Sequence, residues 1–175
     1  AQAPWQTPLS RLNACLGGGI APGMSAYIVG PGGAGKMRFA MALVQHAQER
    51  GATCAWWDPW QMVHPAHPAC RNIDPERLWM SHIPEGDAAR FLALASWCIQ
   101  RRLFDLFVLD LGCEETRMCE ATLANLLAKA WRRNITLVAL HTRSVPVADT
   151  PLRQVTMLQA CRTEAWHQRT PLSLS

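Results

Sequence analysis

The chain has 175 residues, of which 49% are hydrophobic, and its formal net charge is +4. A chain of this length can bury roughly 70% of the surface that its unfolded form exposes, so we expect a single domain over residues 1–175. The isoelectric point near 8.8 stays below the value of about 9 that, with clustered basic residues, indicates a nucleic-acid-binding domain. No apolar run reaches the ~20 residues of a membrane span.

The cysteines and the N-terminus bear on the cellular compartment. Seven cysteines, an odd number, lie in apolar segments such as TCAWW and SWCIQ, which indicates buried reduced thiols rather than a disulfide framework. The first residues lack the basic and apolar regions of a signal peptide. We therefore expect a cytosolic protein in which residues 1–10 are a loose N-terminal segment and residues 162–175 are a C-terminal tail.

Apolar strand-like runs alternate with helical patterns along the chain. The run 25–30, SAYIVG, reads as a first strand; a glycine-rich loop and a helix over 36–50 follow it. The proline-dense segment 59–70 must be a loop, because proline fixes φ and removes a donor. Strands this apolar are buried on both faces, which predicts an α/β fold with a mainly parallel sheet flanked by helices. The further expected elements are strand 52–58, strand 77–83, helix 87–102, strand 104–111, helix 116–133, strand 135–142 and strand 153–161.

The glycine-rich loop, GPGGAGKM at 30–37, lies at the end of an expected strand and opens an expected helix. In that context its backbone N–H groups and the helix N-terminus converge where a phosphate could lie, and Lys36 adds a positive charge. The phosphate-loop pattern requires Ser or Thr after the lysine, and this chain has Met37. The alternative interpretation is a glycine-rich turn that binds nothing.

A second feature expected of a nucleotide site is an acidic residue at the end of another strand. The segment LFVLD supplies Asp110 after four apolar residues, which matches the Walker B pattern. Alone, Asp110 would read as the start of a loop. Together with the glycine-rich loop it predicts a vestigial or weak nucleotide-binding site formed by Gly30, Gly32, Gly33, Gly35, Lys36, Met37 and Asp110.

These segments carry a family resemblance. The stretch 12–58, from LNACLGGG to CAWWD, resembles the start of the RecA-type ATPase core, in which a similar glycine-rich pattern precedes the first core strand, the phosphate loop and its helix. Residues 73–110 and 127–143 follow in the order of the RecA core. The resemblance covers residues 11–161 and implies a RecA-like P-loop core.

The departures from the RecA pattern are systematic. In RecA-like ATPases the hydroxyl after the lysine binds Mg²⁺, whereas Met37 offers a soft sulfur that a hard cation disfavours. Trp60 stands where the resemblance places the catalytic glutamate, and an indole cannot take a proton. The DNA-contacting loop after Asp110 is shortened, while His141 and residues 143–151 replace a γ-phosphate-sensing glutamine and a second DNA loop. The filament-forming N-terminal arm would also have little room in ten residues.

These losses imply an accessory protein rather than an enzyme, with no catalytic residue. The chain resembles the ImuA group of RecA-like accessory proteins of bacterial DNA-damage mutagenesis, in length and in DPERL at 74–78. That resemblance implies a role in the SOS response and translesion synthesis near the bacterial nucleoid, with RecA or a Y-family-type polymerase subunit as partner and weak non-specific DNA binding. ATP is the cofactor that it would take, with Mg²⁺ bound weakly or not at all. The alternative is a working RecA-like ATPase that binds ATP through Gly35 and Lys36.

Two further groups of polar residues have simpler interpretations. His64, His67 and Cys70 in HPAHPAC could present three zinc ligands, but no fourth ligand is evident, so we favour a solvated loop. Lys129, Arg132 and Arg133 end an expected helix, where cations are common, and a DNA or partner patch is the alternative. Arg143 follows a strand near the expected site and could reach a phosphate.

The tryptophans around the second expected strand have several possible roles. Trp56 and Trp57 should face opposite sides of that strand, so at least one belongs to the core. Trp60, at the end of the strand, reads first as core or as a plug in the place of the glutamate. Stacking on a base and anchoring of a partner are the alternatives.

Overall fold

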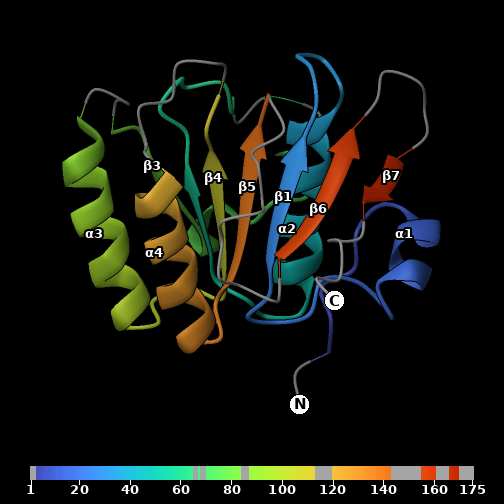
Figure 1. Ribbon diagram of the computed structural model, residues 1–175, viewed down its shortest axis with the longest axis horizontal. Helices are drawn as coiled ribbons and strands as arrows, with labels where there is room; N and C mark the ends of the chain where they lie inside the picture. Colours follow the sequence, from blue (N-terminus) through green and yellow to red (C-terminus); the bar gives the residue numbers. More distant parts are fainter. Residues whose placement is uncertain are drawn as a thin grey trace.

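The computed structural model describes residues 3–64, 67, 70–83, 87–112, 120–142, 155–160 and 166–169. They form a seven-stranded sheet with helices on both faces (Figure 1). The strands lie side by side in the order β3-β2-β4-β5-β1-β6-β7. In chain order the elements are α1 (Ser10–Cys15), β1 (Ser25–Val29), α2 (Lys36–Glu49), β2 (Cys54–Trp57), the 3-10 helix η2 (Pro75–Arg77), β3 (Leu78–Ser81), α3 (Ala88–Gln100), β4 (Leu106–Asp110), α4 (Glu120–Arg132), β5 (Thr136–His141), β6 (Val155–Ala160) and β7 (Trp166–Arg169).

The strands run parallel from β3 to β6, and only β7 is antiparallel to its neighbour. The predicted α/β fold with a mainly parallel sheet is therefore confirmed. Ser25 of β1 lies opposite Leu137 of β5, and Val29 lies opposite His141. This register brings the carboxyl ends of the parallel strands to one edge of the sheet (arrowheads in Figure 1), where ligands of open α/β sheets bind.

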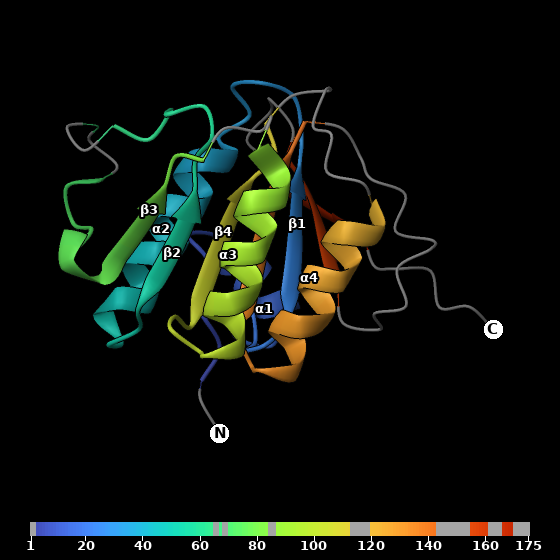
Figure 2. The same cartoon turned by 90° about the vertical axis from the view of Figure 1, so that its left-hand side faces the viewer.

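Helix α2 covers one face of the sheet, and α3 and α4 cover the other (Figures 1 and 2). Because alternate residues of a strand point to opposite faces, Trp56 joins the cluster on the α2 side and Trp57 joins the cluster under α3 and α4. The ring of Trp57 stacks on Phe91 of α3 with centroids 3.9 Å apart. The prediction that the two tryptophans face opposite sides is confirmed, and both belong to the core.

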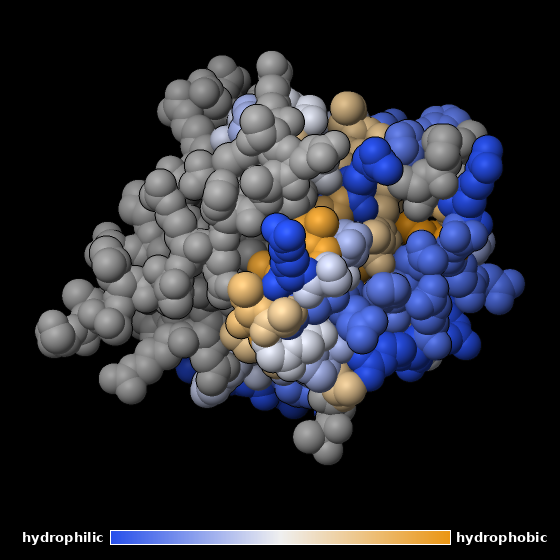
Figure 3. Space-filling view, turned by 90° about the vertical axis from the view of Figure 1, so that its right-hand side faces the viewer, coloured by the Kyte–Doolittle hydropathy of each residue, from blue (hydrophilic) through white to orange (hydrophobic). Residues whose placement is uncertain are grey.

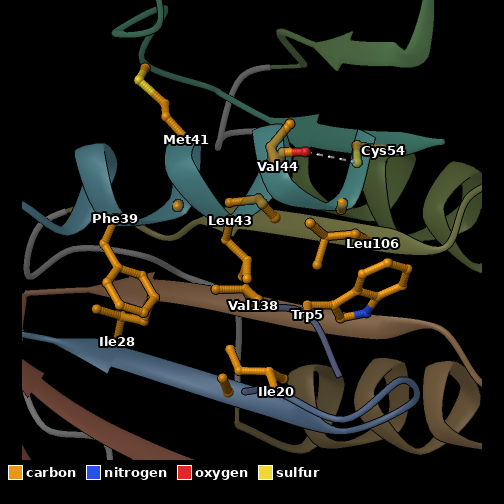
Figure 4. Packing of buried hydrophobic residues seen from close by; sticks show 14 of the residues in the cluster. Trp5, Ile20, Ile28, Phe39, Met41, Leu43, Val44, Cys54, Leu106 and Val138 are labelled. Carbon is orange, nitrogen blue, oxygen red and sulfur yellow. Dashed lines mark hydrogen bonds between the residues drawn. The ribbon is translucent and has the colours of Figure 1, made fainter. Parts of the chain in front are cut away.

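The cluster on the α2 side joins the helix to the middle of the sheet. Leu43 of α2, Leu106 of β4 and Val138 of β5 converge there (Figure 4). The thiol of Cys54 lies 4.0 Å from the carbonyl oxygen of Val44, and burial raises the pKa of Cys54 to about 12. Cys54 is therefore an unreactive thiol. The described cysteines are all free. Cys15 is exposed, whereas we expected the cysteines to be buried.

The described part of the N-terminal segment is packed, in contrast to the loose segment that we expected. Trp5 is 1% exposed, pairs with Ile20 in an antiparallel bridge and donates its Nε1–H to Thr136 Oγ1 over 2.9 Å. The guanidinium of Arg50 lies over the Trp5 ring and donates to the carbonyl oxygen of Pro4. The segment is ordered because Trp5 fills the end of the core cluster beside α2.

Other differences from the sequence-based expectations lie at the ends of the chain. Helix α1 was not expected. Strand β7 lies within residues 162–175, which we expected to be a tail, and it extends the sheet by pairing with β6. The expected helix over 116–133 is α4, which begins at Glu120. Residues 116–119 lie outside the described part of the chain.

The described surface has few large hydrophobic side chains. On the side that carries α1 and β7 its described part is mostly hydrophilic, with small hydrophobic areas between (Figure 3). No helix in the described part is long and apolar enough to span a membrane. Among the described residues, the exposed large hydrophobic ones are Trp60, Met62, Trp79, Trp97, Leu103 and Trp131.

Candidate nucleotide-binding site

The glycine-rich loop connects β1 to α2 at the carboxyl edge of the sheet. Gly33 and Gly35 have φ values of +75° and +83°, a left-handed region that favours glycine. The N–H of Gly30 donates to the carbonyl oxygen of His141 over 3.1 Å, so the loop is anchored to β5. A side chain added at Gly32, Gly33 or Gly35 would meet nothing within 4 Å, so these glycines border open space.

The N-terminus of α2 is open to an anion. Gly35 is its N-cap residue, and no side chain caps the helix. The first N–H groups of a helix lack intrahelical partners and carry the positive end of the helix dipole. With the open glycines beside it, this end of α2 fits a phosphate group.

Lys36 is folded onto the same loop. Its ammonium donates to the carbonyl oxygens of Gly30 and Pro31, over 2.6 Å and 2.9 Å. Partial burial lowers the pKa of Lys36, while the negative charge of Asp110 acts in the opposite direction. The charges of Lys36 and Asp110 therefore interact, although the two residues are distant in sequence.

Asp110 ends β4, the strand two places from β1. Its Oδ1 accepts the N–H of Gly112 over 2.9 Å. Burial raises the pKa of the Asp110 carboxyl; the Gly112 N–H and Lys36 lower it, and the charge of Asp58 raises it further. The charges of Asp58, directly after β2, and Asp110, at the end of the neighbouring strand β4, therefore interact.

Asp58 follows β2 and holds the loop after that strand. It is 0% exposed, and its two carboxylate oxygens accept the N–H groups of Met62 and Val63 over 3.0 Å and 2.8 Å. We did not single out Asp58 as a site residue. The signal was there, because the run CAWWD ends in aspartate as LFVLD does.

Trp60 occupies the region beside Asp110. Its indole lies so close to Gly112 that a methyl group added there would clash with the ring, and the side chain is 41% exposed. Gly112 is held from three sides, since Asp110 accepts its N–H, Thr142 Oγ1 donates to its carbonyl oxygen over 2.6 Å, and Trp60 covers its Cα. Among the interpretations of Trp60, this placement corresponds to a plug that is partly exposed. Neither Gly112 nor Thr142 was recognisable from the sequence.

Met37 is half-buried and packs against the hydrophobic cluster on the α2 side of the sheet. A thioether in that environment is an apolar packing group. It is a poor ligand for Mg²⁺, which prefers oxygen. Of the oxygen ligands that a phosphate loop and a Walker B strand normally supply, this site retains the Asp110 carboxylate. The site thus fits a phosphate better than a hydrated magnesium ion.

The remaining predicted site residues are dispersed. His141 ends β5 opposite Val29, next to the loop, and Arg143 lies outside the described residues. His67 and Cys70 form successive turns with His64, and the Sγ of Cys70 lies 3.8 Å from the Sδ of Met41. Within the described part of the chain, no three His, Cys, Asp or Glu side chains gather into a metal site.

The fold and the loop define a P-loop α/β domain with a RecA-like core. The chain is 32% identical over 100 residues to Protein RecA of Acidiphilium cryptum, which covers 57% of this chain and 29% of that protein. It is 31% identical over 100 residues to each of the RecA proteins of Deinococcus radiodurans and Rickettsia massiliae, again over 57% of this chain and over 27% and 29% of theirs. The match thus covers less than a third of the length of these relatives. No model of a known protein family matches the chain.

Proposed function

We propose that this protein is a RecA-like accessory factor of DNA repair and translesion synthesis that acts through protein contacts, and that its nucleotide site is degenerate. The observation that carries the proposal is the indole of Trp60 packed on Gly112, next to the carboxylate of Asp110. An indole offers no group that could take a proton from water. From the resemblance to RecA we expect a catalytic glutamate at that position.

The position of Met37 supports the same conclusion. Its side chain packs into the hydrophobic cluster on the α2 side, so the group after the loop lysine contributes to the core and supplies no oxygen. Phosphoryl transfer depends on a metal that neutralises the charge developing on the phosphate. Metal-dependent phosphoryl transfer is therefore not part of the proposed function.

A protein partner would need a docking surface, and β3 offers one. In the described sheet β3 is an outer strand whose neighbour is β2. Trp79 of β3 is 47% exposed and stacks on Phe104 with centroids 6.4 Å apart. Leu103, which precedes Phe104 in the chain, is 46% exposed. Outer strands with an apolar flank can accept a strand from another chain. RecA and a Y-family-type polymerase subunit are the partners that we propose.

Capture of partners from DNA-damaged bacterial cells tests this proposal. The wild type and Lys36→Ala should both retain RecA or a Y-family-type polymerase, because the proposed contact requires no nucleotide. Trp79→Asp should lose the partner, whereas Met62→Asp, which changes an exposed large hydrophobic residue in the loop after β2, should keep it. Recovery of neither partner, or loss of the partner on Lys36→Ala with an intact circular dichroism spectrum, would overturn the proposal.

A second candidate function is an ATP-binding RecA-like ATPase. The open glycines and the uncapped N-terminus of α2 favour it, because both are suited to a phosphate. Titration with a fluorescent ATP analogue, with and without Mg²⁺, separates the two candidates. Binding that Mg²⁺ strengthens and Lys36→Ala abolishes would favour the ATPase, whereas weak binding indifferent to Mg²⁺ fits the degenerate site.

A further inference from the structure

The edge of the sheet opposite the phosphate loop carries a basic surface. Helices α3 and α4 lie side by side and both end at that edge (Figures 1 and 2). A contact of 3.2 Å between Lys129 Nζ and Ser96 Oγ joins them. The last residues of the two helices and those directly after them supply two pairs of arginines, Arg101 and Arg102 after α3, and Arg132 and Arg133 at the end of α4.

The two helices end in the same backbone conformation. After α3 the N–H groups of Arg102 and Leu103 donate to the carbonyl oxygens of Ile99 and Cys98, and the corresponding residues after α4 repeat the pattern. The turning residues are Arg102, with φ of +52°, and Asn134, with φ of +57°. Glycine or asparagine favours this left-handed position, and an arginine is strained there. The backbone conformation after α3 therefore does not explain why this position is occupied by Arg102.

The charge of these arginines is not neutralised within the described part of the chain. All four are exposed, and the ion pairs between described residues lie elsewhere, at His46–Glu49, Asp74–Arg77 and Asp87–Arg90. The carboxylate at this edge, Asp105, accepts the N–H of Thr53 over 3.1 Å. Arg50, at the end of α2, serves a structural purpose instead, because it binds the N-terminal segment.

Each arginine pair has an exposed tryptophan beside it. Trp97 of α3 and Trp131 of α4 are each 48% exposed. The guanidinium of Arg101 lies 4.2 Å from the centroid of the Trp97 ring, one helical turn away. Arginines bind phosphate oxygens in pairs, and exposed aromatic rings stack on unpaired bases.

We propose that this basic surface, formed by Trp97, Arg101, Arg102, Trp131, Arg132 and Arg133, binds single-stranded nucleic acid. The arginines contact the phosphates, and the exposed tryptophans stack on bases. The combination of unneutralised guanidinium groups with exposed aromatic rings favours a nucleic-acid strand over an acidic peptide, because a strand offers both phosphates for the arginines and bases for the rings. The site lies away from Lys36 and is independent of nucleotide binding at the loop.

Fluorescence anisotropy with a labelled oligothymidine of about 20 nucleotides tests the site on the whole chain. At 50 mM salt we expect Arg101→Glu/Arg132→Glu to weaken binding at least about tenfold and to reduce the slope of log K against log salt by about 1.4, as two lost phosphate contacts require. Arg11→Glu/Arg71→Glu is the matched control, because it changes the net charge equally at two exposed arginines elsewhere. It should change affinity by less than about threefold.

A second variant separates stacking from charge. Trp97→Ala should weaken oligothymidine binding at least about fivefold and leave the salt slope unchanged. Three results would overturn the proposal: no binding at 50 mM salt, equal losses in the two charge-reversed variants, or competition by polyglutamate as effective as that by unlabelled oligothymidine. Circular dichroism spectra that match the wild type ensure that each loss reflects the surface and not the fold.

Discussion

The two halves of the candidate site differ in how they are built. On the side of β1 the phosphate loop consists mainly of backbone, with open glycines and an uncapped helix N-terminus. On the side of β2 and β4, the Trp60 indole packs on Gly112, and the buried carboxylate of Asp58 accepts backbone N–H groups of the loop after β2. Under the proposed function, the loop keeps a shape suited to phosphate while the side chains after β2 have structural roles.

The largest difference between the two halves should appear in stability. Asp58→Ala removes the acceptor of two N–H groups at a fully buried position, and we expect a loss of about 2–4 kcal/mol in the free energy of unfolding. Lys36→Ala removes two bonds from a solvent-facing loop and should cost about 1 kcal/mol. Urea denaturation followed by tryptophan fluorescence measures both. Equal losses in the free energy of unfolding for the two variants would contradict this difference between the two halves of the site.

Substitutions at two glycines with similar φ values test the difference between the two halves of the site further. Gly112 and Gly33 both have positive φ, so alanine at either should cost about 1 kcal/mol in backbone strain. Gly112→Ala should cost about 1 kcal/mol more, because its methyl group meets the Trp60 indole. The extra cost should disappear in a Trp60→Ala background. A double-mutant cycle that finds no coupling between Trp60 and Gly112 would show that the indole does not close the site.

The smallest expected effect concerns Asp110 and pH. Because burial raises its pKa in the folded protein, its contribution to stability is present below the ordinary value of 3.8 and is lost as pH rises through the raised pKa. Asp110→Asn should therefore have a higher melting temperature than the wild type at pH 7, and the difference should shrink towards pH 3.5. Glu76→Gln, at an exposed position on η2, serves as the control. If the difference in melting temperature between Asp110→Asn and the wild type grew as the pH fell, the account of Asp110 as a destabilising buried carboxylate would be wrong.

Backbone-encoded features were predictable from the sequence, and contacts between distant side chains were not. The alternation of apolar runs with helical patterns predicts the parallel sheet, and glycines before Lys36 predict the loop. The contact of Trp60 with Gly112 depends on how two loops meet after β2 and β4, which no local pattern encodes. Trp5 was missed for a similar reason, since its partners Ile20 and Thr136 are distant in sequence.

Hydrolysis of ATP tests the central claim, that this chain keeps a phosphate loop without its chemistry. Phosphate release is measured for the wild type and for Lys36→Ala, with Mg²⁺ and with and without single-stranded DNA. We expect both proteins to release phosphate no faster than the background under every condition. A turnover of about 1 s⁻¹ or more in the wild type, stimulated by DNA and abolished by Lys36→Ala, would contradict the account.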